Sequence, residues 1–183
     1  MRLRPTPLAG VTLVELALQV DARGQFTRLF CAREMAELAG GEIAQINRSL
    51  TRRPGTVRGL HYQGPPALEA KTIFCLAGAV WDVAVDLRRG SPTFLQWHAV
   101  VLTRANQRAL HLPPGVAHGF QTLEPDSELL YLHSQFYAPE HEGGVRPDDP
   151  RLGITWPREI AGLSERDQSF PLLSDDFPGV EVA

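Results

Sequence analysis

The stretch Val57-Arg-Gly-Leu-His61-Tyr-Gln63 decides how the rest of the chain is organised. Side chains of a strand alternate between its two faces, so His61 and Gln63 share one face and Arg58 lies on the other. Two prolines end this strand at residue 66, and an apolar run resumes at Lys71. The pattern predicts a polar site between facing strands, with a histidine on one strand and a cation on the next.

Short apolar runs separated by turn residues recur along the chain, which contains 16 glycines and 15 prolines. We expect strands over 11–20, 25–30, 43–50, 57–63, 71–76, 80–87, 94–102, 108–112, 119–123 and 128–137. This regular spacing is typical of an antiparallel sandwich or barrel. The length of 183 residues suits one domain. We therefore expect an all-β domain over 1–183 with a few short helices.

Both ends of the chain carry local signals. A turn over 21–24 predicts an early hairpin, and strong helix formers over 32–39, followed by two glycines, predict a helix. The segment 139–183 is rich in Pro, Asp and Gly and is expected to wrap the same domain, with helical turns near Pro157 and Ser164.

Composition excludes several classes of function. The net charge is −3 and the basic residues are scattered, so a nucleic-acid partner is not expected. No apolar run reaches the ~18 residues of a membrane span, and the N-terminal segment lacks a cleavage pattern. Cys31 and Cys75 stand apart in apolar surroundings, which indicates free thiols in a reducing compartment. We expect a cytoplasmic protein with no membrane partner.

Two segments resemble the motifs of cupin barrels: residues 55–78 resemble the first, and Pro113-Pro-Gly-Val-Ala-His118 the second. The resemblance implies a cupin-like jelly-roll barrel or sandwich. Metal-binding cupins carry His-x-His where this chain has His61 and Gln63. With Gln63 in place of the second histidine, the candidate metal ligands are His61, Gln63, Glu69 and His118. This set fits the common histidine-rich sites poorly, so neither a metal nor another cofactor is expected.

A more specific resemblance covers about residues 23–173. The motifs that carry it are Arg58-Gly-Leu-His61-Tyr-Gln63, Lys71, Asp82-Val-Ala-Val-Asp86-Leu-Arg88, Pro113-x-Gly115-x-Ala-His118-Gly-Phe120, Tyr131, Tyr137-x-Pro139-x-x-Glu142, Trp156-Pro157 and Leu163-Ser-x-Arg-Asp167. In order and spacing they resemble the dTDP-4-dehydrorhamnose 3,5-epimerases and their relatives. Those enzymes epimerise nucleotide-linked 4-keto sugars in deoxysugar biosynthesis, without a cofactor.

The resemblance implies four catalytic residues. Inversion next to a ketone needs a base, a cation for the enolate oxygen and an acid on the opposite face. By resemblance, His61 is the base, Asp167 its carboxylate partner, Lys71 the cation and Tyr131 the acid. Other interpretations stay open: Asp167 also fits a helix cap, Tyr131 a core residue and Lys71 a strand-end surface residue.

The resemblance also implies a binding site for a dTDP-4-keto-6-deoxy sugar. Phosphate oxygens suit Arg58, Arg23 and Lys71, and Tyr137 resembles the aromatic residue that stacks on the thymine. The other implied contacts are Phe26, Arg28, Gln45, Asn47, Asp82, His118, Glu142 and Arg166. For Asp82, a role beside Lys71 and a structural pairing are evenly matched, and His118 either bonds the substrate or lines the barrel.

Family members exchange N-terminal strands in a homodimer, so that the segment with Arg23 and Phe26 reaches the partner's site. This chain departs from the family pattern at two positions: Arg28 stands where a glutamate is usual, and Arg166 replaces a commoner lysine. The residues do not distinguish inversion at both C3 and C5 from inversion at one. Three alternatives remain: a metal-dependent cupin enzyme, a non-catalytic sugar-nucleotide-binding cupin and a 3,4-ketoisomerase-like protein.

Overall fold

The computed structural model describes residues 1–38 and 40–182. Its strands are β1 (Arg2–Pro5), β2 (Thr12–Glu15), β3 (Leu18–Asp21), β4 (Gly24–Thr27), β5 (Gln45–Thr51), β6 (Val57–Gln63), β7 (Lys71–Ala77), β8 (Ala79–Asp86), β9 (Trp97–Thr103), β10 (Arg108–Leu112), β11 (Val116–Thr122), β12 (Ser127–His133) and β13 (Glu142–Gly144). A 3₁₀ helix, η1, spans Pro139–His141, and a short α-helix, α1, spans Glu165–Ser169. None of the described helices is long and apolar enough to cross a bilayer.

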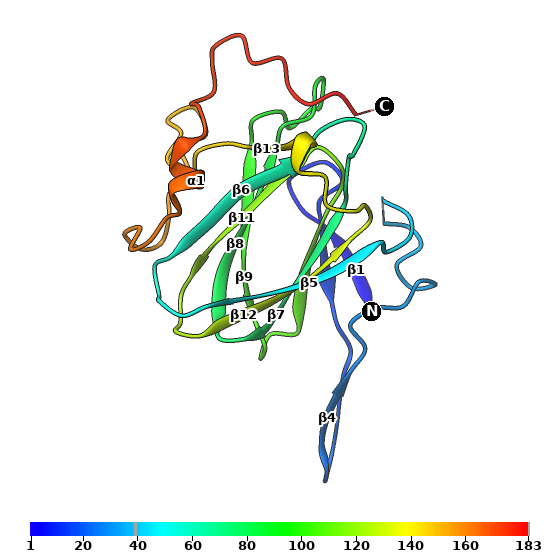
Figure 1. Ribbon diagram of the computed structural model, residues 1–183. Coiled ribbons are helices and arrows are strands. Elements are labelled where there is room, and N and C mark those ends of the chain that lie inside the picture. The colour runs from blue at the N-terminus through cyan, green and yellow to red at the C-terminus, as the bar shows by residue number, and fades with distance from the viewer. Residues whose placement is uncertain (39, 183) are drawn as a thin grey trace.

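The strands form two facing antiparallel sheets (Figure 1). One sheet has the order β1-β2-β10-β7-β12-β5, and the other has the order β13-β6-β11-β8-β9. The third pair, β3 and β4, is a hairpin that projects away from the barrel. This architecture is a jelly roll, which confirms the expected all-β, cupin-like fold.

An apolar layer fills part of the space between the two sheets. Its buried side chains come from β7, β10 and β12 on one side and from β8, β9 and β11 on the other: Ile73, Cys75, Val80, Ala84, Leu102, Leu110, Leu112, Val116, Phe120 and Leu129, with Leu8 and Val11. Burial of each Val, Leu, Ile and Phe side chain in this layer contributes roughly 1.5–3 kcal/mol to folding. The layer leaves the other part of the interior to polar side chains.

The C-terminal segment covers the outer face of the five-stranded sheet. Trp156 lies with its ring centroid 5.3 Å from that of Trp81 on β8, and its indole donates to Pro147 O. Isolated bridges join Thr56 to Gly162 and Arg88 to Val180. These contacts hold α1 beside β6, where Figure 1 shows it.

Strand β6 departs from strict alternation. The register between β11 and β6 shifts between the pairs His118↔His61 and Phe120↔Arg58. Gly59 lies in the left-handed region at φ +121°, and a Cβ there would come within 2.6 Å of Gly119 Cα. Because of this irregularity, Arg58 and His61 face the same cavity. The prediction that they lie on opposite faces is wrong.

Two further expectations are wrong. The expected strand over 11–20 is two strands, β2 and β3, with Leu16 and Ala17 between them. The expected helix over 32–39 is a series of turns over 32–37, and its last residue, Ala39, lies outside the described residues. An isolated helix of this length is marginal, and tertiary contacts decide the conformation: Met35 is buried and Glu34 pairs with Arg28 and the N-terminal amine.

The remaining differences are shifts of boundaries. β11 begins at Val116, before the expected 119, and β12 ends at His133, so that Tyr137 lies beyond the strand. A helical turn near Ser164 is confirmed by α1, whereas residues near Pro157 form bends. Strands β1 and β13 were not expected from the sequence.

Candidate active site

A cavity of about 600 Å³ opens between the two sheets, and most of the residues that line it are polar. β5, β7 and β12 supply one wall, and β6 and β11 supply the other. The lining includes Gln45, Asn47, Ser49, Arg58, His61, Gln63, Glu69, Lys71, His118, Tyr131, His133, Tyr137, Glu142, Arg166 and Asp167. The facing strands predicted to form a polar site therefore do so.

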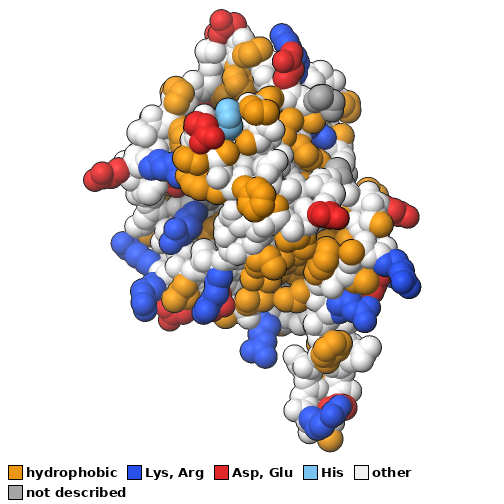
Figure 2. All heavy atoms as spheres, turned by 45° about the vertical axis from the view of Figure 1, so that its right-hand side comes forward, with side chains coloured by type: hydrophobic (Ala, Val, Ile, Leu, Met, Phe, Trp, Pro, Cys, Tyr) orange, Lys and Arg blue, Asp and Glu red, His pale blue; other side chains and the backbone are white. Residues whose placement is uncertain are grey.

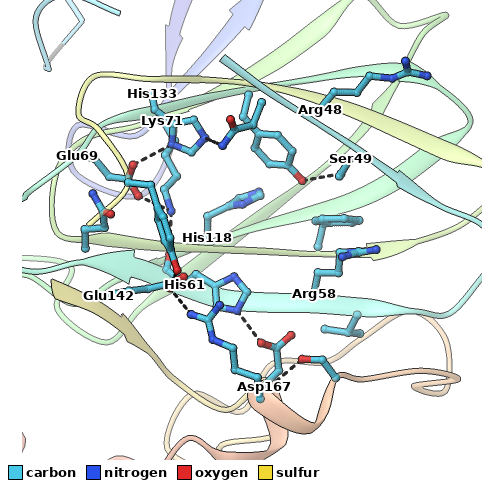
Figure 3. Close-up of a pocket in the computed structure, with 18 of the residues that line it drawn as sticks. Arg48, Ser49, Arg58, His61, Glu69, Lys71, His118, His133, Glu142 and Asp167 are labelled. Atoms are coloured by element: carbon cyan, nitrogen blue, oxygen red, sulfur yellow. Dashed lines mark hydrogen bonds and ion pairs between the residues drawn. The ribbon is translucent and has the colours of Figure 1, made fainter. Parts of the chain in front are cut away.

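His61 on β6 pairs with Asp167 on α1. His61 Nε2 lies 2.6 Å from Asp167 Oδ1 (Figure 3). The second carboxylate oxygen, Oδ2, accepts from Gly59 N at 3.2 Å. Asp167 N also donates to Ser164 Oγ, so the position is both a helix-cap partner and a partner of the histidine. With hydrogen on Nε2, the imidazole keeps its Nδ1 lone pair available to accept a proton.

Burial alone would raise the pKa of Asp167, but the hydrogen bond and charge of His61 and the Gly59 N–H hold it below its ordinary value. The ring of Phe170 lies edge-on to His61, with the two centroids 6.0 Å apart. The imidazole is therefore oriented from two sides by the segment that contains α1.

Lys71, at the start of β7, extends from the opposite wall toward His61. Its Nζ lies 2.9 Å from Glu69 Oε1 and donates to His61 O at 3.3 Å. Glu69 Oε2 lies 2.8 Å from His133 Nδ1. Burial raises the pKa of Glu69, but His133 and Lys71 outweigh burial and hold the pKa below its ordinary value. The lysine is buried, so it is not the ordinary surface residue that the sequence also allowed.

Tyr131 on β12 lies in the same cavity, with its hydroxyl 3.1 Å from Ser49 Oγ. Its ring is edge-on to His118 at a centroid distance of 5.9 Å. Burial raises the pKa of Tyr131 strongly, and the charge of Asp82 adds to this effect. The phenol therefore keeps its proton at neutral pH and is able to donate it.

His118 and Asp82 form a second histidine–aspartate pair, with Nε2 and Oδ1 2.8 Å apart. Asp82 is fully buried and is not among the residues that line the cavity. Of the two interpretations left open for Asp82, the structure shows a pairing and not a role beside Lys71: the charge partner of Lys71 is Glu69, and Asp82 pairs with His118.

Polar side chains gather at the mouth of the cavity. Tyr137 Oη donates to Glu142 Oε2 at 2.7 Å, and Arg166 Nη2 lies 2.5 Å from the same oxygen. Tyr137 N donates to Gln45 Oε1, which places the exposed phenol ring beside the opening. Arg58, which is exposed and also lines the cavity, donates from Nε to Thr51 Oγ1 at 2.9 Å.

Three predicted residues lie away from this cavity. Arg23 is at the tip of the projecting hairpin, where it pairs with Asp21, and Phe26 on β4 is 63% exposed. Arg28 follows the hairpin and pairs with Glu34. Within one chain, none of the three lines the cavity.

Sequence reasoning considered Glu69 only as a candidate metal ligand and assigned no role to His133 or Ser49. Alternation offers a signal for two of them: Ser49 follows Gln45 and Asn47 on β5, and His133 follows Tyr131 on β12. Glu69 stands before β7 in an irregular segment, where periodicity gives no information.

The candidate metal ligands are already engaged with other groups. His61 and His118 each bond an aspartate, and Glu69 bonds Lys71 and His133. Gln63 donates to Ala67 O and Phe136 O. Within residues 1–38 and 40–182, no three His, Cys, Asp or Glu side chains are grouped so that they could hold a metal ion. The set does not fit a metal centre.

Known proteins are similar to this chain in sequence. A protein in Streptomyces griseus named dTDP-4-dehydrorhamnose 3,5-epimerase is 43% identical over 94% of this chain and 87% of its own length. A dTDP-4-dehydrorhamnose 3-epimerase of Streptomyces niveus is 41% identical, over 96% of this chain and 85% of its own. Both relatives are isomerases that act on nucleotide-linked deoxysugars.

Solved structures give the same result. A dTDP-6-deoxy-D-glucose-3,5-epimerase from Legionella pneumophila, in complex with dTDP-4-keto-L-rhamnose, matches with a TM-score of 0.91 and 35% identity over 100% of this chain and 99% of that one. A 3'-monoepimerase from Streptomyces bikiniensis, in complex with dTDP-quinovose, matches with a TM-score of 0.85 and 37% identity, covering 92% and 85%. The family model described as dTDP-4-dehydrorhamnose 3,5-epimerase matches residues 5–175. The chain belongs to the dTDP-4-dehydrorhamnose 3,5-epimerase family.

Proposed function

We propose that this protein inverts C3, or C3 and C5, of a dTDP-linked 4-keto-6-deoxyhexose in the cytoplasm. The observation that carries the proposal is that a base, a cation and an acid share one cavity: His61, Lys71 and Tyr131. Epimerisation next to a ketone requires these three groups and no redox partner.

The reaction begins at His61. Its Nδ1 takes the proton from the carbon next to C4, the C–H electron pair moves into the C4 carbonyl, and Lys71 holds the resulting enolate oxygen. Asp167 stabilises the imidazolium through Nε2. Tyr131 then delivers a proton to the opposite face of the carbon: the enolate electron pair forms the inverted C–H bond as the C4 carbonyl is restored. His61 releases the abstracted proton to solvent, and solvent returns a proton to the phenolate of Tyr131.

The mouth of the cavity suits the nucleotide. The exposed ring of Tyr137 offers a stacking surface for the thymine, and Gln45 and Glu142 hold that ring in place. Arg58, which lines the cavity, offers its guanidinium to the diphosphate. Arg166 pairs with Glu142 at the mouth of the cavity. Its planar guanidinium presents several N–H donors where a lysine would present one ammonium group.

A second copy of the chain completes the site in this proposal. The hairpin extends Val20 and Phe26 into solvent, 66% and 63% exposed. Figure 2 shows apolar side chains gathered on the face of the barrel above the hairpin. A homodimer in which each hairpin crosses to the other barrel would bury these side chains and bring Arg23, Phe26 and Arg28 to the partner's cavity.

Deuterium exchange tests the reaction. The protein is incubated with dTDP-4-keto-6-deoxyglucose in D₂O, and C3 and C5 are followed by NMR. We expect deuterium at one or both carbons together with inverted product. Exchange at neither carbon would contradict an epimerase and leave a binding protein, whereas a product with its ketone at C3 would indicate a ketoisomerase. Activity lost to a chelator would favour the metal-dependent alternative.

Mixing two inactive variants tests the exchanged hairpin. The His61→Asn variant lacks the catalytic base but keeps an intact hairpin. The double variant Phe26→Ala, Arg23→Ala keeps the base but has an altered hairpin. If the hairpin serves the partner's cavity, a mixed dimer contains one complete site and activity returns on mixing. Absence of any recovery in a verified mixed dimer would place the hairpin's role elsewhere.

A further inference from the structure

A hydrogen-bonded chain of four side chains crosses one wall of the cavity, and the proposed reaction uses only its first member, Lys71. Lys71 Nζ lies 2.9 Å from Glu69 Oε1, and Glu69 Oε2 lies 2.8 Å from His133 Nδ1 (Figure 3). His133 Nε2 lies 3.4 Å from Asn47 Nδ2. All four side chains line the cavity.

The partners of His133 define its tautomer. A carboxylate only accepts hydrogen bonds, and the pKa of Glu69 is held below its ordinary value, so His133 Nδ1 carries the hydrogen. On the other side, an amide nitrogen only donates, so Nε2 accepts from Asn47. Together the two contacts correspond to the tautomer of His133 with its hydrogen on Nδ1 and its lone pair on Nε2.

This tautomer has consequences at both ends of the chain. At one end, Lys71 has three N–H groups, and two of them are directed to Glu69 and to His61 O. The third is available for a substrate oxygen. At the other end, the amide nitrogen of Asn47 is turned toward His133, so the carbonyl oxygen of the same amide is turned away from it.

We propose that His133 is a positioning residue for the epimerisation: through Glu69 it fixes Lys71 for the enolate oxygen, and through Nε2 it turns Asn47 so that its carbonyl accepts from an N–H or O–H group of the substrate. The inference rests on the proposed function, because Lys71 acts on an enolate only in that reaction. The inference also predicts a requirement for the substrate: the group that contacts the Asn47 carbonyl must be a hydrogen-bond donor.

A space-filling role alone does not account for His133. Its ring stacks on Tyr131 at a centroid distance of 6.0 Å, and a phenylalanine would serve that contact equally well. The side chain of Glu69 is only 7% exposed, and a buried carboxylate is costly unless its oxygens are satisfied. A histidine supplies the donor that Glu69 needs and also the acceptor that Asn47 needs.

His133→Phe keeps the stacked ring and removes both nitrogens. We expect kcat to fall by ~10- to 100-fold, because Lys71 is no longer held in place, while thermal unfolding shows the variant to be folded. His133→Asn places an amide nitrogen where Nδ1 was and should recover most of kcat, but not the orientation of Asn47. A His133→Phe enzyme with unchanged kcat, beside a wild type that exchanges deuterium, would overturn the positioning role. A wild type without exchange would instead overturn the proposed function.

Coupling through Glu69 gives a second activity test. If His133 acts through Glu69, then Glu69→Gln combined with His133→Phe should be no slower than the slower single variant. Losses that multiply in the double variant would show that the two residues act independently, contrary to the proposal.

The tautomer is testable without any activity. In the ¹⁵N spectrum of histidine-labelled protein, with His133→Asn or His133→Phe used to identify the signal, His133 should show a protonated Nδ1 and an unprotonated Nε2. A protonated Nε2 would mean that Asn47 presents its oxygen to the ring, and this result would overturn the proposed orientation of Asn47 even if neither variant were active.

Discussion

The two histidine–aspartate pairs of this protein have the same chemistry in different surroundings. In the first, His61 and Asp167 are 2.6 Å apart, and their side chains are 28% and 4% exposed. In the second, His118 and Asp82 are 2.8 Å apart and only 7% and 0% exposed. The first pair joins β6 to α1 at the edge of the cavity, whereas the second joins two neighbouring strands inside the barrel.

The pKa values of the two aspartates shift in opposite directions. Burial is the largest influence on both, but it is outweighed at Asp167, where His61 and the Gly59 N–H lower the pKa. At Asp82 burial prevails and raises the pKa. Its second oxygen, Oδ2, has no hydrogen-bond partner among the described residues. Asp167 accepts from more donors than Asp82, so in the proposed reaction the first pair is better suited to stabilise an imidazolium.

Loss of the imidazole should separate the two pairs most strongly. His61→Asn should lower the rate of deuterium exchange by at least ~10³-fold, because no other group in the proposal takes the proton. His118→Asn should cost only about tenfold, chiefly through KM, since its Nε2 is committed to Asp82. Steady-state kinetics and exchange rates of both variants measure the difference. Equal losses would mean that the two pairs share the proton transfer.

The proposed acid, Tyr131, lies on the side of the second pair, and this asymmetry is testable. Tyr131 is edge-on to His118, so Tyr131→Phe removes the donor from one face and leaves His61 and Asp167 on the other. Inversion should fall by ~10²-fold, whereas exchange of the substrate hydrogen with D₂O should fall much less. Normal inversion by Tyr131→Phe would place the acid at another residue.

Exchanging each carboxylate for an amide sharpens the comparison. Asp167→Asn should lower kcat by ~10- to 100-fold, because the amide cannot stabilise the imidazolium of His61. Asp82→Asn should lower kcat by only about threefold, since an amide still hydrogen-bonds His118. The ratio of the two kcat values is the measurement. A ratio near one would show that the second pair also carries charge in the reaction.

The sequence motifs were sufficient to name four of the residues that meet in the cavity. His61, Lys71, Tyr131 and Asp167 all line it, although 106 positions separate His61 from Asp167. Strands β6 and β10 have the expected bounds, and a pair of prolines follows each strand, at 65–66 and 113–114. The catalytic roles of these residues stay proposals that the variants above test.

The sequence did not determine which buried charged side chains pair with each other. Asp82, on an apolar strand, could pair with Lys71 or with His118, and only the register of β8 against β11 decides for His118. Arg58 joins His61 because Gly59 and Gly119 approach each other and shift the register, which alternation does not foresee. The helix expected over 32–39 failed because propensity in a short segment is weak compared with the contacts of Met35 and Glu34.

The smallest expected effect is the change of the unfolding free energy with pH. The two aspartates should contribute to this pH dependence with opposite signs. For Asp167 the native pKa lies below the ordinary 3.8, so the unfolded chain binds more protons in this window and stability rises with pH. That contribution is present above the unfolded pKa and is lost as pH falls through the native pKa. For Asp82 the native pKa lies above 3.8, so the native state binds more protons and stability falls as pH rises.

Urea unfolding of both amide variants and of the parent protein, from about pH 3 to pH 7, separates the two signs. Relative to the parent, Asp167→Asn should lose unfolding free energy as pH rises through the window, because it lacks a carboxylate that is stabilised when charged. Asp82→Asn should gain unfolding free energy over the same range, because it lacks a carboxylate that burial opposes. Differences of the same sign for the two variants would show that His118 compensates the charge of Asp82 as fully as His61 compensates that of Asp167, and the distinction between the pairs would then rest on their exposure alone.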